Sequence, residues 1–188
     1  MSNPSEEMGS APSTDAAALL KDPAVTGRWV IDPAGSRAEF NVKHFWGLVT
    51  VRGSLGELTG EGNIAPDGTV TGRLTIDAAS LSTKNKRRDD HLRSADFFDV
   101  ENHPKVVVNV TGVKPVAANS LEVKGTAEAA GHERPIEFTA HLDDASPLGA
   151  TVRGDIVIDR TGFDMTWSPL GMASAMAHAS VVARFVRP

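Results

Sequence analysis

The sequence predicts an all-β protein whose strands form one antiparallel sandwich or barrel. Three observations carry this prediction. Apolar and polar residues alternate with a period of two in one segment after another, turn residues separate these segments, and no strand–helix–strand repeat occurs. About eight such segments can be counted, which is typical of a sandwich or a small barrel. The chain of 188 residues is long enough for one domain with a sizeable core.

The alternation begins after Arg28 and continues to the end of the chain. Most of the predicted strands present apolar residues to one side and polar residues to the other, whereas segment 105–113 is β-branched and nearly continuous. The predicted strands lie around residues 38–42, 49–52, 73–77, 105–113, 121–124, 136–142, 155–159 and 181–185. Turn residues separate them at 33–35, 66–68, 118–120 and 130–131.

One charged segment, residues 82–99, is the longest interruption of this pattern. It mixes lysines and arginines with aspartates, carries His91 in its middle and ends on Phe97 and Phe98. Residues 88–95 predict the only strong helix of the domain. We expect the charged part to lie on the surface and the two aromatic rings to fix it to the core.

Residues 1–27 are predicted to be a flexible acidic tail, and residues 28–188 the folded domain. Four acidic residues against Lys21 give the tail a formal charge of −3, which leaves −2 of the total −5 for the domain. Thr14 can cap a short helix through Lys21, or the whole tail can be disordered. The N-terminus lacks the pattern of a secretory signal and no apolar run reaches the length of a membrane span, so we expect a cytoplasmic protein without an integral membrane segment.

Several kinds of chemistry find no support in the sequence. The chain has no cysteine, which excludes disulfides and thiolate sites, and its acidic balance gives no indication of a nucleic-acid partner. The six histidines are spread out and form no recognisable metal motif, so we predict no metal, no cofactor and no catalytic residue. Residues 60–65 match a dinucleotide-binding fingerprint in letters, but a turn rather than a helix follows, so we reject that interpretation.

Residues 162–177 form an unusually apolar loop that contains three methionines. Its large side chains cannot all be exposed without a cost in free energy. The loop can be a plug over one end of the barrel, or a flexible portal for an oily ligand, because methionine adapts to varied apolar shapes. A barrel of about eight strands can likewise be filled by side chains or hold one small ligand, and both require the same apolar interior.

Several motifs occur in an order that resembles one known family. They are Trp29–Pro33, Ser36, Phe40–His44, Val51–Gly53, Ser80–Thr83, Asp90–Ser94, Asp96–Val100, Pro104, Gly131–Pro135 and Arg160–Phe163. The sequence is similar in these positions to the YceI-like, polyisoprenoid-binding proteins, over residues 28–187. The segment HLRS followed by DFFDV is the most specific part of the resemblance. The sequence departs from the family pattern around residues 160–167 and in lacking an export signal.

The resemblance implies an extended antiparallel β-barrel of lipocalin-like form, with a short helix and long loops. It also implies that a long isoprenoid chain, such as that of an isoprenoid quinone, is bound inside the barrel by a protein that is often a homodimer. On this hypothesis the wall of the pocket is formed by Phe40, Val42, Phe45, Trp46, Phe138, Ile156, Ile158 and Met165, and polar contacts at its mouth by His44, Arg87 and Arg93. The choice along residues 38–44 assumes that the even-numbered face points inward.

Two other functions stay open at this point. One is an enzyme that uses His44 or His91 with a nearby aspartate, since catalytic groups can come together in the fold without a sequence motif. The other is a stress-related interaction module whose barrel is filled. An internal cavity would count against the filled barrel.

Overall fold

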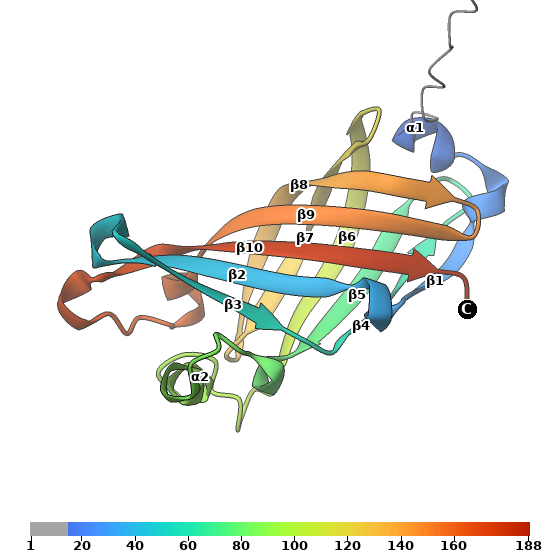
Figure 1. The fold of residues 1–188 in the computed structure, drawn as a ribbon. Helices are drawn as coiled ribbons and strands as arrows, with labels where there is room; N and C mark the ends of the chain where they lie inside the picture. The colour runs from blue at the N-terminus through green and yellow to red at the C-terminus, as the bar shows by residue number, and fades with distance from the viewer. Residues whose placement is uncertain (1–14) are drawn as a thin grey trace, which may run out of the picture.

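Ten antiparallel strands form one closed sheet in the computed structural model, which describes residues 15–188 (Figure 1). The strands are β1 (Gly27–Ile31), β2 (Arg37–His44), β3 (Val49–Leu55), β4 (Leu58–Ile64), β5 (Val70–Asp77), β6 (Lys105–Ala117), β7 (Ser120–Ala129), β8 (His132–Ser146), β9 (Gly149–Asp159) and β10 (Ala173–Val186). Eight of them close a ring in the order β1-β4-β5-β6-β7-β8-β9-β10, and the pairing of β10 with β1 completes it. The hairpin β2–β3 pairs with the first part of β10 and lengthens the barrel wall.

The predicted all-β, lipocalin-like barrel is therefore confirmed, and the strand pattern missed two of its strands. β1 shows no alternation, because Trp29, Val30 and Ile31 are three apolar residues in succession. β4 carries Gly60 and Gly62, which hide its period because glycine has no side chain to place on either face. A Cβ atom at Gly60 would lie 2.4 Å from the Arg73 carbonyl oxygen, so the close approach of β5 requires glycine there.

The helical part of the described chain is small. It consists of α1 (Ala16–Leu19), α2 (Lys86–Arg93) and six short 3-10 turns at Pro23–Val25, Pro33–Gly35, Phe45–Gly47, Ala78–Ser80, Arg160–Phe163 and Pro169–Gly171. The helix expected over residues 88–95 is α2, which begins two residues earlier. It begins there because the side chain of Asn85 accepts a hydrogen bond from the Arg88 backbone N–H at 3.1 Å, as an N-cap does.

One end of the barrel is covered by the segment from residue 15 to residue 27, which was expected to belong to a flexible tail. Asp15 caps α1, and the expected cap, Thr14, lies with the rest of residues 1–14 outside the described residues. Ala16 and Val25 are fully buried, and the Trp29 indole N–H donates to the Val25 carbonyl oxygen at 2.9 Å. This segment is held because its apolar side chains contact core residues of β7 and β8.

The opposite end of the barrel is formed by two protruding loops and by α2 (Figure 1). The first loop is the tip of the β2–β3 hairpin, residues 45–48, and the second is the apolar segment 164–172 before β10. The two loops lie side by side, because the Phe45 backbone N–H donates to the Met172 carbonyl oxygen at 2.7 Å. Among residues 15–188, no helix has both the length and the hydropathy needed to cross a membrane.

Candidate functional site

The barrel encloses a cavity of about 1100 Å³. Its wall is built mainly from the inward faces of the strands and is predominantly apolar. On β2 the even-numbered residues 38, 40, 42 and 44 all line it, so the assumed orientation of this strand is confirmed. Pockets for drug-sized ligands measure roughly 300–1,000 Å³, so this cavity exceeds that range. The barrel is hollow, which counts against the filled-barrel hypothesis.

Most of the predicted binding residues line this cavity. They are Phe40, Val42, His44, Phe45, Arg87, Phe138, Ile156, Ile158 and Met165. The structure brings them together from β2, α2, β8, β9 and the loops next to these elements. Their position is therefore the expected one, and their role in binding stays a prediction.

Two predicted site residues do not belong to the lining. Trp46 lies at the tip of the β2–β3 hairpin with 79% of its surface exposed, because the tight turn directs it away from the barrel. Arg93 is engaged in structure instead: its Nε donates to the Ala79 carbonyl oxygen at 3.0 Å and its guanidinium also contacts the Leu81 carbonyl. Arg93 therefore holds α2 to the turn before it rather than facing a ligand.

Arg160 is a buried cation in the cavity wall. Only 7% of its surface is exposed, and its guanidinium donates to the carbonyl oxygens of Ser174 and Met165. Burial lowers the pKa of Arg160, and the neighbouring charge of Asp159 partly opposes this. No carboxylate of residues 15–188 lies within ion-pair distance of its guanidinium. The cavity wall therefore holds a positive charge that backbone carbonyls solvate.

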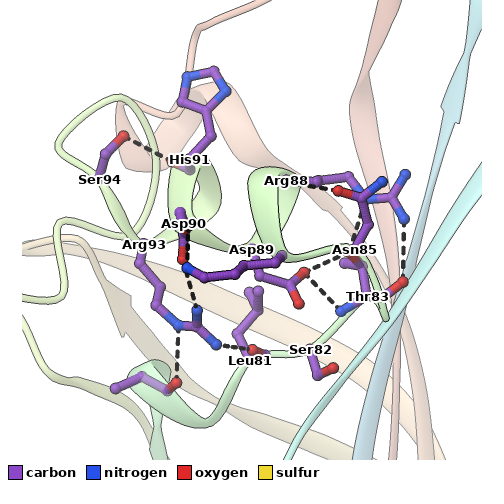
Figure 2. Close-up of polar contacts among 12 residues, drawn as sticks. Leu81, Ser82, Thr83, Asn85, Arg88, Asp89, Asp90, His91, Arg93 and Ser94 are labelled. Atoms are coloured by element: carbon purple, nitrogen blue, oxygen red, sulfur yellow. Dashed lines mark hydrogen bonds and ion pairs between the residues drawn. The ribbon is translucent and has the colours of Figure 1, made fainter.

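Arg88 is a second cation in the cavity lining. The buried carboxylate of Asp89 and the side chain of Arg88 both hydrogen-bond Thr83, in the segment before α2 (Figure 2). The Arg88 Nε donates to the Thr83 hydroxyl oxygen at 2.7 Å, and Thr83 donates its backbone N–H to Asp89 at 2.8 Å. Burial alone would raise the pKa of Asp89, but the hydrogen bonds from Thr83 and the charges of Arg93 and Arg88 leave it below the ordinary value. This network fixes the orientation of α2 at the barrel mouth.

His44 lines the same end of the cavity. Partial burial lowers the pKa of its imidazole, and the positive charges of Arg160 and Arg88 lower it further. His44 is therefore neutral at neutral pH, where its ring can donate or accept one hydrogen bond to a polar group in the mouth.

We expect His44 to make the folded state less stable in acid. The pKa of His44 is lower in the folded chain than in the unfolded chain, so the unfolded chain binds more protons as the pH falls. The contribution of His44 to the free energy of unfolding therefore decreases as the pH drops below about 6.5, the ordinary pKa of histidine. The variant His44→Gln should show a smaller loss of stability than the wild type between pH 7 and pH 5 in urea unfolding. His178→Gln, on the exposed part of β10, is the control. Equal pH dependence in the wild type and His44→Gln would contradict the assignment.

A family model for the YceI-like domain matches residues 29–185. The chain belongs to the YceI-like family. A UPF0312 protein of Vibrio cholerae is 32% identical over 120 residues, which is 61% of this chain and 62% of that protein, so the match spans less than two thirds of the relative's length. A UPF0312 protein of Staphylococcus aureus is 29% identical over 143 residues, or 72% of this chain and 82% of that protein.

Solved structures with low sequence identity share the YceI-like fold. BcnA of Burkholderia cenocepacia matches with a TM-score of 0.74 at 18% identity, covering 82% of this chain and 98% of that one. A polyisoprenoid binding domain from Saccharophagus degradans matches with a TM-score of 0.71 at 17% identity, covering 85% and 98%. A YceI protein of Campylobacter jejuni matches with a TM-score of 0.66 at 18% identity, covering 75% and 87%. At these identities the likeness concerns the fold.

Within this YceI-like barrel, the two histidines considered for catalysis lie in different surroundings. His91 Nε2 lies 2.8 Å from Asp96 Oδ2, and its ring meets the edges of Phe97 and Trp167. In the described chain, neither His44 nor His91 hydrogen-bonds a serine or threonine hydroxyl. Residues 15–188 also contain no group of three potential metal ligands. These arrangements do not favour the enzyme hypothesis, and the absence of catalysis stays a prediction.

The sequence prediction missed most of the YceI-like cavity wall. The additional lining residues include Val106, Val108, Leu121, Val123, Ala177, Ala179 and the two arginines Arg88 and Arg160. The alternation in their strands contained the signal for the apolar ones. The sequence contained no such signal for the two arginines, because basic residues next to aspartates are typical of a solvent-exposed surface.

Proposed function

We propose that this protein binds a long-chain amphipathic lipid, most simply a polyisoprenoid or an isoprenoid quinone, with the chain in the barrel and the polar group at the mouth. The observation that carries the proposal is the apolar cavity of about 1100 Å³ inside the barrel, open at its mouth. A ligand of this kind needs few specific contacts along its chain, since the dryness and the shape of the cavity select it.

The apolar wall supplies the driving force for this binding. Each methylene group that leaves water for an apolar environment contributes roughly 0.8 kcal/mol. A chain of tens of carbon atoms therefore has a large favourable term, which exceeds the ordering costs of association. Ala16 and Val25 lie in the cavity wall at the end that α1 covers. The far end of a lipid chain that reaches this point from the mouth would be surrounded by apolar side chains.

The mouth supplies the polarity. His44, Arg87, Arg88 and Arg160 line this end of the cavity from β2, α2 and the turn after β9. These groups donate hydrogen bonds, and three of them are cations, so they suit a carbonyl, hydroxyl or anionic head group. The carbonyl oxygen of a quinone, although uncharged, can accept hydrogen bonds from these groups.

The comparison with known proteins supports the same ligand class. The barrel from Saccharophagus degradans, which has the same fold, is a polyisoprenoid binding domain. We extend that ligand class to this chain because its own cavity is large and its wall is predominantly apolar. Carriage, storage or sequestration of the lipid would all use this cavity. We further expect a homodimer in the cytoplasm, which light scattering of the purified protein and cell fractionation would check.

The proposal is tested by titrating lipids that differ in chain length but share one head group. Ubiquinone analogues with one, four and eight isoprene units are added, and binding is followed by mass spectrometry of the intact complex. Affinity is expected to rise steeply with the number of units, because each adds buried apolar surface. Equal affinity for the three analogues, or no binding of any, would contradict the proposal.

A further inference from the structure

Large apolar side chains are exposed at the two loops that flank the cavity mouth. Leu170 is 89% exposed, Leu48 is 85% exposed and Trp46 is 79% exposed. Phe45 and Trp167 in the same two loops, and Val49 at the start of β3, are also exposed. The loops are joined by the hydrogen bond between Phe45 and Met172, so these side chains form one apolar tip, defined here as residues 45–49 and 167–170.

Several of the exposed apolar residues of this tip have a left-handed backbone conformation. Phe45, Trp46 and Leu170 have φ angles of 51°, 55° and 53°. This left-handed region costs free energy for large residues and normally takes glycine or asparagine. Both turns therefore present a bulky apolar side chain where a small polar residue would fold more easily. Such a local cost is commonly associated with a functional surface.

Basic residues lie beside the apolar tip. Lys43 lies two residues before the first loop, Lys84 lies two residues before α2, and Arg87 lies in the first turn of α2, whose inner face lines the same mouth. All three are exposed, and none has an ion-pair partner among the described residues. The nearby acidic groups Asp90 and Asp96 are already paired, with Lys86 and with His91. Asp164 is the remaining exposed carboxylate of the second loop.

We propose that the apolar tip docks on the surface of an anionic lipid bilayer, with Trp46, Leu48 and Leu170 inserted among the lipids. Tryptophan is favoured at membrane–water interfaces because its ring is amphipathic. Lys43, Lys84 and Arg87 would contact the lipid phosphates, and each basic residue near an anionic surface strengthens binding about fivefold. In this orientation the cavity mouth faces the bilayer, so a lipid can pass between the two without crossing water.

A second copy of the chain is the other occupant to consider for this surface. Two identical tips brought together would place Lys43, Lys84 and Arg87 of one copy near the same cations of the other. Such like-charge contacts disfavour association. An anionic bilayer is complementary to both the apolar and the basic part of the surface. The inference goes beyond the proposed lipid binding, because docking does not depend on which chain the cavity holds.

The test is flotation of the full-length protein with vesicles. The wild type is expected to bind vesicles of equal parts phosphatidylglycerol and phosphatidylcholine, and to bind pure phosphatidylcholine vesicles at least tenfold more weakly. The double variant Trp46→Ser/Leu170→Ser should reduce binding to the anionic vesicles at least tenfold. Leu148→Ser is the control, because Leu148 is 77% exposed in the β8–β9 turn at the opposite end of the barrel. Lys84→Gln/Arg87→Gln should weaken binding about 25-fold, and Lys114→Gln should not.

Quenching of tryptophan fluorescence by brominated lipids gives a second readout. Quenching that is present in the wild type and largely lost in Trp46→Phe would place Trp46 in the bilayer. Equal flotation of the wild type and the double variant would overturn the proposal. Failure of the wild type to bind the anionic vesicles would also overturn it. If light scattering then showed that the double variant converts a dimer to a monomer, the tip would be a self-association surface instead. Because these assays use no cavity ligand, failure here leaves the chain-length test unaffected.

Discussion

Replacing Ala179 with tryptophan is expected to weaken binding of a long-chain lipid roughly 100-fold while the barrel stays folded. Ala179 lies in the middle of β10, opposite Phe40 on β2 and Ile156 on β9, and lines the cavity together with both. An indole ring there would occupy space that about four methylene groups of the ligand would otherwise fill. At roughly 0.8 kcal/mol each, their exclusion corresponds to about 3 kcal/mol, or about two powers of ten in affinity.

The cavity has room for this ring, so the cost to folding should be small. The matched control is Val157→Trp on the neighbouring strand, because Val157 is half exposed on the outer face of the barrel. Titration with the eight-unit quinone, together with urea unfolding of both variants, measures the effect. Ala179→Trp binding the quinone as tightly as Val157→Trp, with both proteins folded, would mean that the ligand lies elsewhere.

Replacing Arg160 with methionine is expected to lower the free energy of unfolding by about 3 kcal/mol, since groups that lose a buried hydrogen-bond partner cost ~1–3 kcal/mol each. Arg160 joins the loop after β9 to the start of β10 through the carbonyls of Met165, Ser174 and Ala173. Its guanidinium also lies 5.9 Å from the centre of the Phe97 ring. Methionine fills a similar space but removes the donors to the Met165 and Ser174 carbonyls, whereas the Ala173 carbonyl keeps its hydrogen bond from the Ser168 hydroxyl.

The control for this variant is Arg153→Met, which breaks the exposed ion pair with Asp143. Exposed ion pairs contribute about 0–1 kcal/mol, so this change should have little effect. Urea unfolding at neutral pH compares the two variants with the wild type. Losses of similar size in both would show that the buried contacts of Arg160 are not what holds the loop.

The fold was largely predictable from the sequence, because alternation along β2 and β8 directly reports which side chains face the interior. Phe40, Val42 and Phe138 were assigned to the cavity wall for this reason, and the structure places them there. β4 was missed because Gly60 and Gly62 carry no side chain that could show a period. Local pattern is informative only where side chains differ between the two faces.

The mouth was less predictable, since its geometry depends on contacts between segments far apart in the sequence. In the sequence, Trp46 extends the apolar pattern of the preceding strand, but the turn at residues 45–47 directs its side chain outward. Arg93 resembles its neighbours in charge, yet it is engaged by carbonyls in the segment 79–81. Arg160 was not considered for the site because its burial arises only when β10 and the loop after β9 pack around it. The volume of the cavity is likewise a property of the closed barrel.

The most direct test of lipid binding is native mass spectrometry of the protein purified from its own host without detergent, followed by solvent extraction of the bound material. We expect an added mass of one polyprenyl or other long-chain compound per chain, which is lost on extraction and occurs in a much smaller fraction of Ala179→Trp. Protein that is uniformly empty, and that takes up neither isoprenoid quinones nor fatty acids when they are added, would contradict the account.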